Sequence, residues 1–329
     1  MTSTGPQKVV ALSGGIGGAK LALGLSRIVA PEHLTIIANT GDDFEHLGLA
    51  ISPDIDTLKY TLAGLANPEL GWGRGDETWN FMAALRDIGG EDWFNLGDRD
   101  LAIHVERTHR LAAGERLTTI TKDIARSLGV GPSILPMSDS PVRTCVESDQ
   151  GRLPFQDYFV RLKCAPVVKA LEFEGVEDAR PSPEIERALS DPDLNAVIIC
   201  PSNPLISIDP ILAVPGMRSA IANCKAPVIA ISPIVAGKAL KGPTAKMLNE
   251  LGIGATAAVV ADRYRDLLSA YVVEADDYDD CLNAGFPFAI EAARTIMTSL
   301  DDREALARTV LATADRVRDG ETGTARAIV

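Results

Sequence analysis

The feature that most constrains this chain is an apolar run that leads directly into a glycine-rich turn and then a helix. Residues 8–12 (KVVAL) are continuously apolar, residues 13–20 (SGGIGGAK) form the turn, and residues 19–28 carry apolar side chains at helical spacing. A second apolar run at 34–38 completes a β-loop-α-β unit. Because such units join parallel strands by a right-handed crossover, this segment predicts a buried parallel sheet.

The same alternation of strands and helices returns in the second half of the chain. The apolar runs 196–200 and 228–231 predict two strands, with a helix between them at about 211–223. Residues 257–260 predict a further short strand, and residues 303–318 a closing helix. These strands are expected to join the N-terminal ones in a single sheet.

The middle of the chain has a different pattern. Residues 44–130 favour helices, whereas 142–147, 158–162 and 168–173 favour strands separated by Gly and Pro. We interpret this stretch as a smaller α+β lobe inserted into the core.

The predicted fold class is therefore α/β. We expect a Rossmann-like parallel sheet core flanked by helices, from about 7–135 and 195–300, with the inserted lobe at about 140–180.

Composition and charge narrow the possible partners. The chain is 46% hydrophobic and 23% charged, as ordered globular proteins are. Its 45 acidic residues outnumber 32 basic ones, and a net charge of −13 argues against a broad nucleic-acid-binding face. No apolar stretch reaches about 18 residues and the N-terminus lacks a signal-peptide pattern, so we expect a cytoplasmic protein without a membrane partner.

The glycine-rich turn is a candidate phosphate site, because backbone N–H groups at a helix start can approach an anion closely. The turn lacks the Gly-Lys-Ser/Thr ending of a P-loop, and a lysine stands at the third glycine position of the dinucleotide fingerprint. A tight structural turn is the alternative. The candidate residues are Gly14, Gly15, Gly17, Gly18 and Lys20.

Four acidic residues follow the second predicted strand. Asp42 and Asp43 come directly after it, and Asp54 and Asp56 lie at the start of the next helix. Carboxylates that converge at one sheet edge repel one another unless a cation neutralises them, so Mg²⁺ with a diphosphate is the expected occupant. The alternative for Asp56 is a simple helix cap.

Two later segments also suit ligand binding. Ser202 and Asn203 follow the strand 196–200 and suit a base or ribose, although turn chemistry selects the same residue types. Lys238, within the small-residue segment 232–243, suits an anionic ligand, with a solvated surface lysine as the alternative.

Alternating acids and bases in 95–100, followed by His104 and Arg107, form a further charged constellation. Such patterns are often ion-paired helix caps. The alternative is that these residues position a substrate.

Taken together, six motifs resemble the 2-phospho-L-lactate transferase family of coenzyme F-420 biosynthesis, and in particular its actinobacterial phosphoenolpyruvate transferase branch. Each motif alone is weak, but they run in the family's order from residue 8 to about 260. The motifs are SGGIGGAK (13–20), NTGDD (39–43), PDIDT (53–57), LGDRD (96–100), PSNP (201–204) and SPIVAGKALKGP (232–243).

The resemblance implies a single transferase domain over residues 1–329 that requires Mg²⁺. Its reaction would move a 2-phospholactyl or phosphoenolpyruvyl group from lactyl- or enolpyruvyl-2-diphospho-5′-guanosine to a ribityl hydroxyl of the deazaflavin Fo. GMP would leave, and (dehydro) coenzyme F-420-0 would form. The resemblance also suggests a homodimer.

The resemblance implies roles for particular residues as well. Asp56 and Asn95 would contact Fo, although a basic residue is common in the family at the position of Asn95. We further hypothesise that Asp43 and Asp56 hold the metal, and that Asp42 or Asp56 acts catalytically by helping to deprotonate the attacking hydroxyl.

Two other functions compete with this interpretation. The glycine-rich β-α-β start also suits a nicotinamide- or flavin-dependent oxidoreductase. A non-catalytic nucleotide-binding regulator of the same fold is the second alternative, because fold alone does not decide activity.

Overall fold

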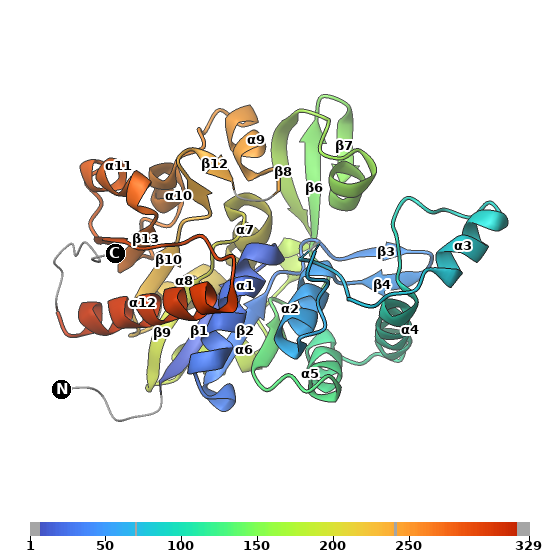
Figure 1. Ribbon diagram of the computed structural model, residues 1–329, viewed down its shortest axis with the longest axis horizontal. Helices are drawn as coiled ribbons and strands as arrows, with labels where there is room; N and C mark the ends of the chain where they lie inside the picture. The colour runs from blue at the N-terminus through green and yellow to red at the C-terminus, as the bar shows by residue number, and fades with distance from the viewer. Residues whose placement is uncertain (1–6, 70, 240–241, 321–329) are drawn as a thin grey trace.

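The computed structural model describes residues 7–69, 71–239 and 242–320, and its core is a seven-stranded sheet in which every strand pair is parallel (Figure 1). The predicted α/β fold class is thereby confirmed. Across the sheet, the strands lie in the order β14 (Ala289–Ala292), β13 (Ala270–Val273), β10 (Val228–Ile231), β9 (Leu194–Ile199), β1 (Lys8–Ser13), β2 (Leu34–Ala38) and β5 (Ser133–Pro136).

The order of the strands reverses beside β1. The chain runs from β1 outward through β2 to β5, and then returns to the other side of β1, where β9 begins the second half of the sheet. The connections that follow β1 and β9 therefore lead to helices on opposite faces of the sheet. In open α/β sheets, ligands bind at this switch point.

Helices cover both faces of the sheet because the strand residues alternate between two apolar cores. Val9 and Ala11 face one core, and Val10 and Leu12 face the other. On the first face lie α1 (Gly15–Ile28), α2 (Pro53–Ala63), α5 (Leu117–Ser127) and α12 (Leu300–Arg318). On the second face lie α6 (Pro183–Ser190), α7 (Asp209–Ala213), α8 (Met217–Asn223) and α10 (Ala257–Arg263).

Two extensions flank the end of β2 (Figure 1). One is an arm made of the antiparallel hairpin β3 (Phe44–His46) and β4 (Leu49–Ile51) with α3 (Asn80–Asp87) and α4 (Asp98–Ala112). The other is an antiparallel sheet of β6 (Arg143–Ser148), β7 (Gly151–Pro154) and β8 (Val168–Glu174), which lies within the range predicted for the inserted lobe. The division of the chain into core and lobe stays a prediction.

The remaining elements are short connections. They are η1 (Pro31–His33), η2 (Asp157–Arg161), η3 (Val176–Asp178), η4 (Pro204–Ile208), β11 (Ile234–Val235), β12 (Lys238–Ala239), α9 (Thr244–Glu250), η5 (Ala275–Asp277) and α11 (Tyr278–Asn283).

Two predicted strands are helical in the structure. Residues 257–260 lie in α10, which begins where the Thr256 side chain accepts a hydrogen bond from the Val259 amide. Residues 158–162 lie mostly in η2, a helical turn whose backbone closes between Leu162 and Asp157. Both segments are short and rich in apolar side chains, and periodicity alone does not separate strand from helix in such runs.

The helix predicted at 211–223 is two helices. The break lies at Val214–Gly216, where Pro215 interrupts the backbone ladder and Gly216 adopts a φ of 92°. Among the described residues, no single helix has both the length and the apolar composition to cross a membrane. Pro204–Ala213 and Met217–Asn223 meet those limits only when taken together, across a bend of 84°.

Candidate active site

The loops after β1 and β9 pack against each other at the switch point, and glycine makes that packing possible. The amide of Gly14 donates a hydrogen bond to the hydroxyl of Ser202 over 3.2 Å. A Cβ added to Gly17 would lie 2.2 Å from the carbonyl oxygen of Pro201, and one on Gly18 would lie 2.5 Å from the Ser202 hydroxyl. The glycine-rich turn therefore places bare backbone at the carboxyl edge of the sheet.

Replacement of Gly17 by alanine is expected to destabilise the protein by about 1–3 kcal/mol, because its methyl group would overlap a backbone carbonyl that has no free rotation. The matched control is Gly75→Ala, whose added Cβ would have its nearest neighbours at 3.5 Å. Urea unfolding of the two variants tests this. Equal stabilities would show that the loop accommodates a side chain at Gly17.

Asn39, at the end of β2, ties two of the predicted aspartates to the glycine-rich turn. Its amide nitrogen donates to Asp42 Oδ1 over 3.1 Å and to Asp54 Oδ2 over 2.9 Å. Asp54 Oδ1 in turn accepts from the Gly15 amide over 2.7 Å. Burial raises the pKa of Asp54 to about 6, and burial followed by the Asp54 charge raises the pKa of Asp42 well above its ordinary value.

Asp43 is buried beside these residues and uses only one carboxylate oxygen. Its Oδ2 accepts a hydrogen bond from the Ser52 hydroxyl over 2.8 Å, whereas its Oδ1 is buried without a hydrogen-bond partner. Burial raises the pKa of Asp43 to about 7, and the nearby charges of Arg143 and Arg107 oppose that rise. A carboxylate with an unused buried oxygen is suited to a ligand.

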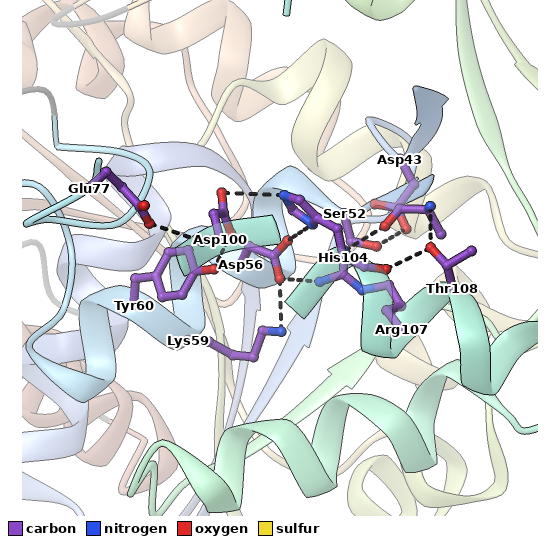
Figure 2. Close-up of polar contacts among 11 residues, drawn as sticks. Asp43, Ser52, Asp56, Lys59, Tyr60, Glu77, Asp100, His104, Arg107 and Thr108 are labelled. Atoms are coloured by element: carbon purple, nitrogen blue, oxygen red, sulfur yellow. Dashed lines mark hydrogen bonds and ion pairs between the residues drawn. The ribbon is translucent and has the colours of Figure 1, made fainter. Parts of the chain in front are cut away.

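Asp56 lies at the centre of a buried ion-pair network (Figure 2). Its Oδ1 accepts from Arg107 Nη2 and lies 2.8 Å from Lys59 Nζ, and both cationic side chains are fully buried. Burial by itself would raise the pKa of Asp56, but the charges of Arg107 and Lys59 outweigh it and hold the pKa below its usual range. Asp56 is therefore an ionised carboxylate whose orientation is fixed through Oδ1.

The network continues to Asp100, which accepts a hydrogen bond from the Tyr60 hydroxyl (Figure 2). His104 lies between the two acids, with Nδ1 3.7 Å from Asp56 Oδ2 and Nε2 3.4 Å from Asp100 Oδ2. Ligand atoms of Asp56, Asp100 and His104 all lie within 4.8 Å of one another, which is close enough for a metal ion. Because Lys59 already neutralises part of this charge, we interpret the trio as a polar scaffold.

Buried carboxylate oxygens without hydrogen-bond partners are candidate ligands for a divalent cation. Among the buried side chains that the structure describes, only two carboxylate oxygens are unpartnered, Oδ1 of Asp43 and Oδ2 of Asp56. Mg²⁺ prefers oxygen ligands and is usually held by one or two carboxylates together with substrate phosphates. These are the same two residues that the sequence analysis assigned to the metal, and that role stays a prediction.

Two other predicted nucleotide ligands occupy different surroundings. Asn203 Oδ1 accepts from the Leu205 amide over 2.9 Å, while its Nδ2 is buried without a hydrogen-bond partner and so is available to a ligand. The amine of Lys20 donates to the carbonyl of Met297 over 2.8 Å, at the loop that precedes α12.

Lys238 and Asn95 lie on the periphery. Lys238 is exposed at the tip of the hairpin that β11 and β12 form, and the hairpin is fastened where the Ala236 amide donates to Asp277 Oδ2 over 3.0 Å. Asn95 is exposed on the arm, where its Oδ1 accepts from Arg86 Nη2 over 3.0 Å. Their roles in ligand binding stay predictions.

Sequence reasoning missed Lys59 and Asn39 as parts of the site. Lys59 follows Asp56 by three residues on a helix whose other residues at that face are buried, so a lysine there signals a buried partner. Asn39 begins the NTGDD motif but carries no signal of its role as the shared donor to two aspartates.

The raised pKa of Asp43 predicts a pH-dependent stability. The pKa of Asp43 is about 7 in the folded chain and about 4 in the unfolded chain. The stabilisation that the protonated carboxyl contributes is therefore fully present below pH 4 and is lost as the pH rises through 7. Asp43→Asn removes that loss. In metal-free buffer, the stability of the variant relative to the unmodified protein should rise by about 3 kcal/mol from pH 5 to 8.

Urea unfolding at several pH values measures this difference. A stability difference that stays constant with pH would contradict the assignment of a raised pKa to Asp43.

The fold and these residues together define an α/β protein with a switch-point site that combines backbone amides and buried carboxylates. A profile described as "2-phospho-L-lactate transferase CofD" matches residues 9–285, and the chain belongs to that family of transferases. The family assignment and the resemblance stated above agree, and a transferase is favoured over an oxidoreductase or a non-catalytic regulator.

Relatives from bacteria and archaea cover nearly the whole chain. It is 41% identical over 321 residues to a phosphoenolpyruvate transferase of Kitasatospora aureofaciens, covering 95% of this chain and 99% of that protein. It is 34% identical over 311 residues to the 2-phospho-L-lactate transferase of Methanosarcina mazei, covering 92% and 99%. A solved structure of a UPF0052 family protein from Bacillus halodurans shares the fold, with a TM-score of 0.63, 15% identity, and coverage of 94% of this chain and 100% of that one.

Proposed function

We propose that this chain transfers a phosphoenolpyruvyl or 2-phospholactyl group in coenzyme F-420 biosynthesis. The donor is a guanosine diphosphate ester of the acid, the acceptor is a ribityl hydroxyl of Fo, and GMP leaves. The observation that carries the proposal is the contact of the glycine-rich turn with Asp54, in an acidic segment where Asp43 and Asp56 each keep one buried carboxylate oxygen without a hydrogen-bond partner. The names of the relatives supply the class of transferred group.

The residues of this site suit phosphoryl-type transfer, because catalysis of that reaction depends mainly on positioning the substrates and stabilising charge. The nucleotide lies across the carboxyl ends of β1 and β9, where amides of the glycine-rich turn and the free Nδ2 of Asn203 donate hydrogen bonds. Asp43 and Asp56 would hold Mg²⁺, which offsets the charge of the diphosphate when bound.

Of the two candidate bases, the surroundings favour Asp42. The charges of Arg107 and Lys59 hold Asp56 ionised, which makes it a weak proton acceptor. Burial and the Asp54 charge make Asp42 a stronger one. In the reaction, the hydroxyl oxygen of Fo forms a bond to the phosphorus that carries the acid, its proton passes to Asp42, and the bond from that phosphorus to the GMP oxygen breaks.

The acceptor site is proposed on the side of the arm. Asp56 lies at its inner end and Asn95 on its exposed surface, and both would contact Fo. We also propose that the protein forms a homodimer and acts in the cytoplasm.

Mass spectrometry of the reaction products tests this function. The protein is mixed with Fo, Mg²⁺ and either the lactyl or the enolpyruvyl donor, with EDTA in place of Mg²⁺ as the control. We expect GMP and a product with the mass of F-420-0 or its dehydro form, only when Mg²⁺ is present. Absence of both products with both donors would refute the proposal.

A further inference from the structure

A substrate carboxylate that binds beside the buried aspartates needs a cationic side chain of the protein to face it. Four buried aspartates line the loop and the following helix, and the two buried cations, Lys59 and Arg107, are already ion-paired with Asp56. The carboxylate of a lactyl or enolpyruvyl group would therefore meet repulsion unless another cation faces it.

Arg143 is a cation near the acidic loop that has no acidic partner. Among the described residues, no carboxylate oxygen lies within 4.0 Å of its guanidinium, and its hydrogen bond runs from Nη1 to the Val142 carbonyl over 2.9 Å. Glu174 stands opposite Arg143 in the register of β6 and β8, but the Glu174 carboxylate pairs with Arg152 over 3.1 Å. Arg143 is half-buried, and its Nη2 and Nε have no hydrogen bond to the described residues.

The backbone beside Arg143 is fastened to the acidic loop. The Thr144 amide donates to the Gly41 carbonyl over 2.8 Å, and the Gln156 side chain donates to the Asp42 carbonyl over 2.9 Å. The charge of Arg143 also opposes the rise that burial causes in the pKa of Asp43. The start of β6 thus holds a guanidinium beside the residues proposed to bind the reacting groups.

We propose that Arg143 binds the carboxylate of the transferred acid, in a two-bond contact that selects donors with a carboxylate on the carbon that carries the phosphate ester oxygen. The planar guanidinium matches a carboxylate in geometry and offers it two parallel N–H donors. This inference rests on the proposed function, since it names how the same site recognises the group it transfers.

The test compares two donors and two enzymes. One donor is the acid ester that the unmodified protein uses, and the other is the same ester without its carboxylate, ethyl in place of lactyl or vinyl in place of enolpyruvyl. Arg143→Met should lower kcat/KM by about 30- to 1,000-fold with the acid donor and by less than about 3-fold with the donor that lacks it.

Arg187→Met is the control, because Arg187 is exposed on α6 and pairs with Glu184; it should leave kcat/KM with either donor within about 3-fold of the unmodified protein. Binding of GDP with Mg²⁺ should be the same in Arg143→Met and the unmodified protein, which shows that the variant is folded. An equal loss with both donors, or no loss with the acid donor, would overturn the role of Arg143. Failure of the unmodified protein to use either acid donor would instead overturn the proposed function.

Discussion

Arg107→Met is expected to destabilise the protein by about 3–5 kcal/mol. The guanidinium is 1% exposed, donates to Asp56, and donates from Nη1 to the Ala50 carbonyl over 3.1 Å. Its removal leaves a buried carboxylate with Lys59 as its remaining cation, and a buried charge that loses one partner of its network is costly. Urea unfolding near neutral pH measures the change.

Arg110→Met is the control for Arg107. Arg110 lies one turn further along α4, is partly exposed, and pairs with the exposed carboxylates of Glu115 and Asp123. Because such surface pairs contribute about 1 kcal/mol or less, its loss should be small. If the two variants lost equal free energy of unfolding, the ion pair between Arg107 and Asp56 would not contribute as a buried, unscreened interaction.

Asp43→Asn and Asp56→Asn are each expected to lower kcat by about 10²- to 10⁴-fold, provided that the variants remain folded. Each substitution replaces a charged oxygen ligand with a neutral amide at the point where the diphosphate must be neutralised. The affected oxygens are the unpartnered Asp43 Oδ1 and Asp56 Oδ2. Steady-state rates of GMP release measure the effect.

Glu45→Gln is the control for these two variants, because Glu45 is exposed on β3 close to Asp43 in sequence. It should turn over the donor at the unmodified rate. Near-normal rates for Asp43→Asn and Asp56→Asn would remove both residues from the mechanism.

Much of the fold was predictable because its central strands are apolar runs followed by turn-forming residues such as Gly, Pro, Ser and Asn. β1, β2, β9 and β10 carry such runs, and they are the strands around the switch point. β14 is the edge strand and β13 lies between it and β10; each has four residues, and such short runs carry little periodicity, so neither was predicted. Their place is fixed by the pairing of β13 with β10 and of β14 with β13, which is a tertiary effect.

The site was predictable to a smaller extent. Asp42 and Asp43 follow β2, which places them at the carboxyl edge of the parallel sheet, and Asp54 and Asp56 lie in the first turn of α2. Which of their oxygens are free depends on partners distant in sequence: Arg107 is 51 residues from Asp56. Arg143 enters the site from the β6 sheet, and local periodicity gives no sign that this strand docks on the loop after β2.

A crystal structure with GDP and Mn²⁺ tests the central claim most directly, since the anomalous signal locates the metal without reference to activity. We predict one anomalous peak, from a Mn²⁺ ion within bonding distance of Asp43 Oδ1, Asp56 Oδ2 and the diphosphate. The nucleotide should lie across the carboxyl ends of β1 and β9. A nucleotide bound elsewhere, or a metal that contacts neither aspartate, would contradict it.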